Sequence, residues 1–153
     1  MKKLLLAFDG FDHSLPALEE AAEVARDDGV QVTVLSVVPP DARGSKSGGH
    51  VGLAPHAHED VARAHAYLRD EAGIDAEMKI AHGDPADEIL AEANTGRYDL
   101  LVTGTRGRGP IARVLLGSVS HKVAEQTPCT LLVVTEDRLV RIEPRAVARA
   151  RRQ

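Results

Sequence analysis

Glycine, serine and arginine gather between residues 103 and 122 in a pattern suited to binding phosphate. Gly104, Gly107 and Gly117 are separated by two and by nine residues, and Ser118 follows the last of them directly. Glycine permits the positive φ angles and the close ligand approach that a phosphate loop needs. A serine at a helix start can cap the helix, and N–H groups there point toward an anion. The spacing therefore predicts a polyphosphate site.

The charge around these glycines supports the same interpretation. No acidic residue lies between Asp99 and Glu125, although the whole chain has a net charge of −4. Four cations fall in this interval: Arg106, Arg108, Arg113 and Lys122. A polyphosphate ligand explains a basic loop within an acidic protein, although an ordinary glycine turn with solvated arginines would have the same composition.

Two other glycine motifs fit the segment less well. The sequence has no G-x-x-x-x-G-K-[ST], which excludes a Walker-type P-loop. Residues 107–112 match the dinucleotide pattern G-x-G-x-x-A, but they lie in the last third of the chain. Pro110 also interrupts the helix that this pattern should open. The match to the dinucleotide pattern is therefore weak.

Apolar runs and helical periodicity predict an α/β domain around this loop. The expected strands cover residues 3–8, 30–38, 76–81, 100–102 and 130–134, and the expected helices cover 14–28, 59–72 and 84–93, with a further helical turn from 117. This alternation favours an open five-stranded parallel sheet with helices on both faces. Ligands bind such sheets beyond the carboxyl ends of the strands, where the winding direction reverses.

Residues 41–56 have the composition of a linker, and we expect a mobile loop on the ligand side of the sheet. Several potential metal ligands lie in or after this loop: His50, His56, His58, Asp60 and His65. The H-x-H spacing without cysteine is not that of a structural zinc site, which favours solvated histidines over a metal centre.

The charge distribution divides the chain into a domain over residues 1–137 and a basic C-terminal tail over 138–153. The tail holds six Arg and one Glu, a charge of +5, so the remaining 13 basic and 22 acidic residues give −9. Arginines without aromatic residues are weak support for nucleic-acid binding. The single Cys129 fits a reducing compartment, and residues 4–8 are too short for a signal peptide. We therefore expect a soluble, cytoplasmic protein.

With its flanking strands, the glycine segment resembles the universal stress protein family, in particular the branch that binds ATP. The resemblance is carried by G-x2-G-x9-G-S, by D-L-L-V-T before it and P-C-T-L-L-V-V after it, and by residues 4–18 and 83–90. It spans residues 2–135. The resemblance implies a Rossmann-like fold, similar to the adenine nucleotide alpha hydrolases, with strand order 3-2-1-4-5.

The resemblance also implies which residues bind the nucleotide. Asp9 would hold a ribose hydroxyl or a Mg²⁺ that bridges the phosphates, although a carboxylate capping the next helix is the alternative. Val37 would pack against adenine, and Phe11 stands where the family usually has serine. The expected cofactor-binding residues are Ala7, Phe8, Asp9, Val37, Thr103, Gly104, Gly107, Arg108, Gly117, Ser118 and Val119.

These features predict an ATP-binding regulatory or stress-response protein with slow or no ATP hydrolysis, because no base is evident beside the glycine loop. ATP, ADP and AMP all remain candidate ligands. The resemblance implies a homodimer in which Thr130–Val134, as an edge strand, pairs with its copy in a second subunit. A nucleotide-free dimeric interaction module and a dedicated phosphohydrolase are the alternatives; the glycines favour the nucleotide binder.

Overall fold

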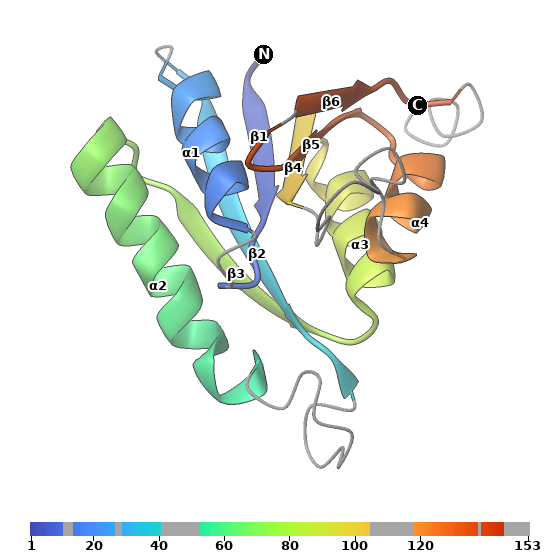
Figure 1. Cartoon of the computed structure of the whole chain (residues 1–153), viewed down its shortest axis with the longest axis horizontal. Helices are drawn as coiled ribbons and strands as arrows, with labels where there is room; N and C mark the ends of the chain where they lie inside the picture. Colours follow the sequence, from blue (N-terminus) through green and yellow to red (C-terminus); the bar gives the residue numbers. More distant parts are fainter. Residues whose placement is uncertain (11–13, 27–28, 41–52, 105–117, 138, 146–153) are drawn as a thin grey trace.

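The computed structural model describes residues 1–10, 14–26, 29–40, 53–104, 118–137 and 139–145, and shows one six-stranded sheet with helices on both faces (Figure 1). The strand order is β3-β2-β1-β4-β5-β6, in which β1 to β5 run parallel. The elements are β1 (Lys3–Ala7), α1 (Leu15–Val24), β2 (Gln31–Val38), α2 (Leu53–Ala72), β3 (Glu77–His82), α3 (Pro85–Gly96), β4 (Leu100–Gly104), α4 (Ser118–Gln126), β5 (Thr130–Val134) and β6 (Leu139–Ile142). The predicted α/β fold and the order 3-2-1-4-5 are confirmed.

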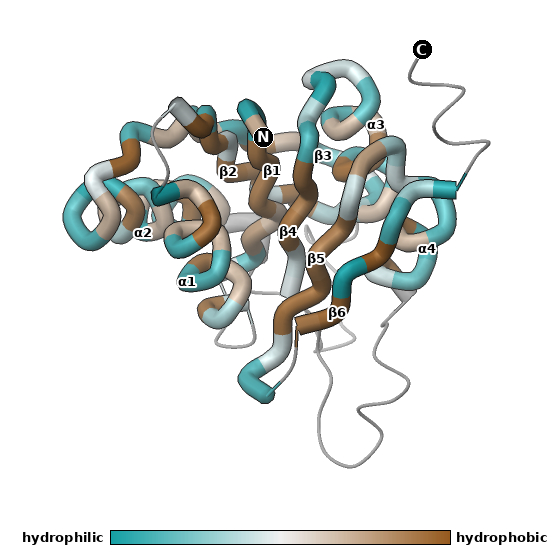
Figure 2. The backbone as a smooth tube through the Cα atoms, turned by 90° about the horizontal axis from the view of Figure 1, so that it is seen from above, coloured by the Kyte–Doolittle hydropathy of each residue, from teal (hydrophilic) through white to brown (hydrophobic). Residues whose placement is uncertain are grey.

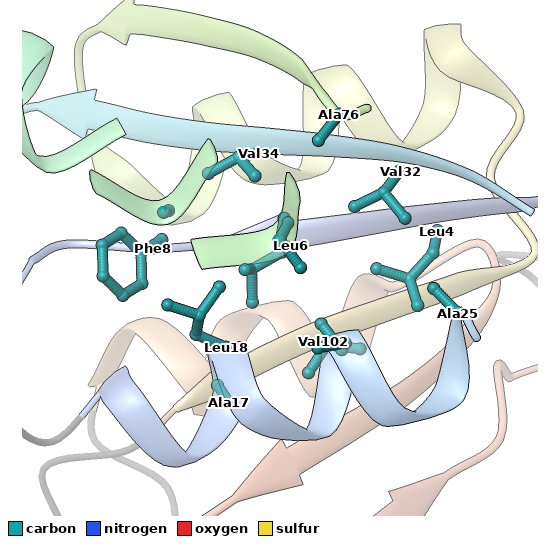
Figure 3. Packing of buried hydrophobic residues seen from close by; sticks show 14 of the residues in the cluster. Leu4, Leu6, Phe8, Ala17, Leu18, Ala25, Val32, Val34, Ala76 and Val102 are labelled. Carbon is teal, nitrogen blue, oxygen red and sulfur yellow. The ribbon is translucent and has the colours of Figure 1, made fainter. Parts of the chain in front are cut away.

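The central strand β1 supplies apolar side chains to both faces of the sheet. Successive residues of a strand point to opposite faces, so Leu4, Leu6 and Phe8 pack under α1 and α2 (Figure 3). Leu5 and Ala7 point the other way, into a second cluster with residues of α3 and α4. Because both faces are covered, β1 is apolar along nearly its whole length, which is typical of parallel sheets.

The helix boundaries follow local signals, with one difference from the prediction. The side chain of Asp84 caps α3 by accepting a hydrogen bond from the N–H of Asp87 at 3.0 Å, and Pro85 occupies the first turn. Helix α2 begins at Leu53, so the predicted loop over 41–56 is wrong for its last four residues. Proline is tolerated near a helix start, and Pro55 lies there. None of the helices within the described ranges is long and apolar enough to cross a membrane.

The sheet has one strand more than predicted. Residues Leu139–Ile142, expected to belong to a basic tail, form β6 and pair antiparallel with β5. The expectation that Thr130–Val134 is an edge strand is therefore wrong, because the same chain folds back over that edge. Only four residues, 135–138, separate the two strands in the sequence.

A polar cluster ties the start of β1 to α3 and β3. The Lys3 ammonium donates to the carbonyl of Gly96 at 2.6 Å and lies 4.8 Å from the ring centre of Tyr98. The Tyr98 hydroxyl donates to Glu92 Oε1 at 2.8 Å, and Lys79 Nζ donates to the same oxygen at 2.8 Å. Burial by itself would raise the pKa of Glu92, but these two hydrogen bonds lower it. Glu92 is therefore held as a carboxylate inside the fold.

Burial, reinforced by the neighbouring Glu92 carboxylate, raises the pKa of Tyr98 to about 12 from its ordinary value of 10. Because the folded pKa lies above the unfolded one, this group stabilises the fold fully below pH 10. That stability is lost as the pH rises from 10 to 12.

We expect Tyr98→Phe to lower the free energy of unfolding by about 1–2 kcal/mol near neutral pH, because the hydrogen bonds of its hydroxyl with Glu92 and Thr33 are lost. The difference from the wild type should shrink between pH 10 and 12, where the wild-type phenol ionises. Urea unfolding followed by circular dichroism across this range measures both effects. Tyr67→Phe, at the other tyrosine, is the control for replacing a phenol by a phenyl ring. An unchanged Tyr98→Phe deficit at pH 12 would contradict the assignment.

Candidate functional site

The winding direction of the sheet reverses between β1 and β4. After β1 the chain passes to α1 on one face, whereas after β4 it passes to α4 on the opposite face (Figure 1). The two strands are parallel neighbours with Ala7 opposite Thr103. The carboxyl ends of the two strands therefore lie side by side at the edge where open α/β sheets bind ligands.

Six of the expected site residues lie at three adjacent strand ends. Ala7 pairs with Thr103 on β4 and with Leu35 on β2, and the N–H of Phe8 donates to the Leu35 carbonyl at 2.9 Å. Asp9 and Val37 each lie two residues beyond this Ala7–Leu35 pair, and Gly104 follows Thr103. The residues that the structure brings to this edge are Ala7, Phe8, Asp9, Val37, Thr103 and Gly104.

Burial separates these residues into supports and candidate contacts. Ala7, Phe8 and Thr103 are buried, and Phe8 belongs to the core beneath α1. Asp9, Val37 and Gly104 are partly exposed at the edge. A ligand at this edge would therefore reach the Asp9 carboxylate and the Val37 side chain, whereas Phe8 acts through packing.

The glycine loop itself continues from Gly104 beyond the described part of the chain. Gly107, Arg108 and Gly117 lie outside the described residues, as does Phe11. The loop returns at Ser118, the first residue of α4, and Val119 packs against the cluster beneath α3 and α4. The spacing thus predicted the start of α4 correctly.

Ser120 links the two ends of the glycine loop, a role that the sequence analysis missed. It is buried, and its hydroxyl donates to the carbonyl of Gly104 at 3.5 Å. Thr103 Oγ1 donates to the same carbonyl at 3.2 Å. The Ser120 contact joins the end of β4 to the first turn of α4, so the described residues on the two sides of the loop lie close together. The second serine in Ser118-Val119-Ser120 is the only sequence signal for this contact.

The turn after β1 rests on α2 through a second contact that the sequence analysis missed. Gly10 has φ +83°, and a Cβ added there would lie 2.2 Å from the carboxyl carbon of Asp60. Asp60 is only 7% exposed and accepts a hydrogen bond from Arg63, whose guanidinium also donates to the Gly10 carbonyl at 3.4 Å. Asp60 and Arg63 therefore fix the turn that carries Asp9. In the sequence, the i,i+3 spacing of Asp60 and Arg63 is the signal that could have indicated their contact.

Lys122, which the charge pattern grouped with the glycine loop, contacts the start of α3. Its ammonium donates a hydrogen bond to Asp87 and lies 3.9 Å from Asp84, both at the start of α3. The hydrogen bond to Asp87 raises the pKa of Lys122. The charge of Lys122 is thus used to join α4 to α3. The other cations of the predicted set, Arg106, Arg108 and Arg113, lie outside the described residues.

Among the residues that the structure describes, no group of three or more His, Cys, Asp or Glu side chains is placed to hold a metal ion. His65 is partly buried and lies 3.2 Å from Asp75 Oδ1, so its partner is a carboxylate and not a metal cluster. His50 and the side chain of His56 lie outside the described residues. Asp9 alone would supply one carboxylate to a Mg²⁺ held mainly by phosphate oxygens and water.

We expect Gly10→Ala to destabilise the protein by roughly 2–3 kcal/mol, because alanine is strained at positive φ and its Cβ would displace Asp60. Gly29→Ala is the matched control: Gly29 has φ +89°, and none of the described residues beyond its chain neighbours has an atom within 4 Å of the added Cβ. It should cost about 1 kcal/mol, from backbone strain alone.

Chemical denaturation of both variants, and of Gly10→Ala in an Asp60→Ala background, separates backbone strain from the contact with Asp60. Removing Asp60 should reduce the cost of Gly10→Ala to that of Gly29→Ala. Equal losses of unfolding free energy for the two glycine variants in the native background would contradict the steric contact between Asp60 and a Cβ at position 10.

Comparison with known proteins agrees with this architecture over nearly the whole chain. The profile of the Universal stress protein family matches residues 1–135. Universal stress protein YxiE of Bacillus subtilis is 31% identical over 144 residues, covering 86% of this chain and 97% of that protein. A universal stress protein of Thermus aquaticus is 33% identical over 136 residues, covering 87% and 98%. A universal stress protein solved in complex with cAMP is 25% identical, with a TM-score of 0.68 over 88% of this chain and 96% of that one. The chain therefore belongs to the universal stress protein family.

Proposed function

We propose that this protein binds an adenine nucleotide at the carboxyl edge of β1 and β4 and acts as a nucleotide-dependent regulator in the stress response. The observation that supports the proposal is the register of Ala7 with Thr103, because Asp9 and the first glycine of the motif, Gly104, follow these two paired residues within two positions. A related protein of the same fold has been solved with cAMP, an adenine nucleotide with the same base and ribose as ATP.

The proposed contacts follow the chemistry of each group. Asp9 accepts hydrogen bonds from the ribose or holds Mg²⁺, and Val37 packs against the adenine ring. The N–H groups of Gly117, Ser118 and Val119 bind phosphate oxygens at the start of α4. Arg108 adds a positive charge for the terminal phosphates of ATP, the nucleotide that we favour over AMP and ADP.

Hydrolysis of the bound nucleotide is proposed to be slow or absent. A hydrolase needs a base that orients an attacking water. Near the turn after β1, Asp60 of α2 already accepts a hydrogen bond from Arg63, and Asp9 is assigned to the ribose or Mg²⁺. Regulation then depends on whether nucleotide is bound and not on its turnover. A phosphate-release rate within the ordinary enzyme range of about 1–10³ s⁻¹ would overturn this part of the proposal.

We further propose how the chain is divided, where it acts and what it contacts. Residues 1–137 form the nucleotide-binding domain, and residues 138–153 follow as a basic segment that contributes β6. A cytoplasmic location is consistent with the single cysteine.

A homodimer that pairs through β5 requires β6 to leave that edge first, because β6 occupies it. The regulatory partner is a protein that distinguishes the bound from the free state.

We expect ATP at 100 times its Kd to stabilise the wild type by about 2.7 kcal/mol and Gly117→Val to lose that stabilisation, because the valine side chain would occupy the phosphate path. Thermal unfolding with AMP, ADP and ATP, with and without Mg²⁺, measures the effect, and calorimetry gives the Kd. The unliganded variant should unfold at nearly the wild-type temperature. A wild type that binds none of the three nucleotides would favour the nucleotide-free interaction module.

We expect Arg108→Gln to weaken ATP binding about tenfold while changing AMP binding little, because a charge-assisted hydrogen bond contributes about 1.5–3 kcal/mol. Lys122→Gln is the matched control: it removes the same charge, but Asp87 holds that lysine. Its ATP affinity should equal that of the wild type. Calorimetric titrations of both variants with ATP and AMP make the comparison, and a larger ATP loss in Lys122→Gln would reverse the assignment of the two cations.

A further inference from the structure

Asp9 lies just beyond β1, between two points at which the backbone is held. Before it, the N–H of Phe8 donates to the carbonyl of Leu35 in β2 at 2.9 Å, which continues the sheet pairing past the end of β1. After it, the carbonyl of Gly10 accepts a hydrogen bond from Arg63 of α2 at 3.4 Å. The direction of the Asp9 side chain therefore depends on both contacts, because the φ and ψ angles of Asp9 join them.

The contact that follows Asp9 comes from outside the sheet. Helix α2 lies beside α1 on one face, whereas α3 and α4 cover the other (Figure 2). Helix α2 carries none of the expected site residues. The hydrogen bond from Arg63 to Gly10 nevertheless links this helix, through the backbone, to the carboxyl end of the central strand.

Asp60 holds Arg63 at this turn. One nitrogen of the guanidinium, Arg63 Nη2, donates both to the Asp60 carboxylate and to the Gly10 carbonyl. Burying a carboxylate is costly, and an apolar side chain against Gly10 would cost less. The carboxylate adds a fixed orientation for Arg63, a flexible side chain that is 65% exposed. Placement of the turn therefore explains this pair better than stability does.

A second acid–arginine pair of the same spacing shows what the first one adds. Glu23 Oε2 lies 3.4 Å from Arg26 Nη1 at the far end of α1 from the turn, and both side chains are exposed. Exposed pairs of this kind contribute little to stability. Arg26, 59% exposed, resembles Arg63 in charge, exposure and spacing from its acid. It is therefore a matched control for Arg63, at the opposite end of the sheet from the site.

We propose that Asp60 and Arg63 are positioning residues of the nucleotide site: they hold the Gly10 turn so that the Asp9 carboxylate faces the ribose hydroxyls. This inference rests on the proposed function, in which Asp9 accepts hydrogen bonds from the ribose. A carboxylate that is held in place before the ligand arrives loses less conformational entropy on binding. Neither positioning residue touches the nucleotide, so their effect is confined to the ligand group that Asp9 contacts.

The test compares ATP with dideoxy-ATP, the analogue that has neither ribose hydroxyl. We expect the wild type to bind ATP about tenfold more tightly, because hydrogen bonds to a carboxylate are lost with the analogue. Arg63→Gln should reduce this ratio to about threefold or less by weakening ATP binding, with the Kd of dideoxy-ATP unchanged. Arg26→Gln should keep the wild-type ratio. Calorimetric titration of the three proteins with both nucleotides gives the Kd values.

Replacing Asp60 separates the positioning contact from the fold. Asp60→Asn keeps an oxygen that accepts from Arg63 and should keep most of the ratio, whereas Asp60→Ala should lower it as Arg63→Gln does. A purely structural role would weaken the binding of both nucleotides by the same factor, and that result would overturn the inference.

The outcomes for the wild type distinguish this inference from the proposed function. If the wild type prefers ATP and the ratio is unchanged in Arg63→Gln and Asp60→Ala, the inference is wrong and the proposed function stands. Equal binding of ATP and dideoxy-ATP by the wild type also overturns the inference, because Asp9 then makes no ribose contact to be positioned. A wild type that binds neither nucleotide overturns both.

Discussion

The arrangement depends on one constraint: β1 must be buried on both faces of a parallel sheet. Its side chains alternate between the two core clusters, with Leu4 and Leu6 on one side and Leu5 and Ala7 on the other. A strand covered on both faces needs helices above and below, and the chain provides them by reversing its winding direction between β1 and β4. That reversal defines the position at the carboxyl edge where open α/β sheets bind ligands.

The two ends of β1 are held by different chemistry. At its start, the Asp99 carboxylate accepts hydrogen bonds from the N–H groups of Lys2 and Lys3 at 2.9 and 3.0 Å, and Lys3 is further held by Gly96. At its finish, Gly10 lies against the buried Asp60. The rigid start sets the register with β4, and the tightly packed turn at the finish sets the direction in which the chain leaves toward α1. A nucleotide site at this edge would therefore need little rearrangement on the side of β1.

Strand β6 extends one edge of the sheet and leaves the order of the five parallel strands unchanged. The order of the five parallel strands fits the resemblance, and the additional antiparallel strand uses residues beyond the 1–135 span that matches the family. A few alternating apolar residues are enough to form β6, because the outer edge of β5 offers backbone N–H and C=O groups along its whole length.

The sequence by itself determined the strands of the core, the order of helices and strands, and the start of α4 at Ser118, because apolar periodicity and glycine spacing are local signals. Only the tertiary structure decided that Lys122 joins α3, that Asp60 supports Gly10 and that β6 covers β5. In each of these contacts the two partners lie far apart in the sequence or in different elements, so they meet only once the elements that carry them have packed together. Strand β6 escaped prediction for a further reason: four residues among arginines carry too little alternation to distinguish a strand from a solvated tail until β5 is in place.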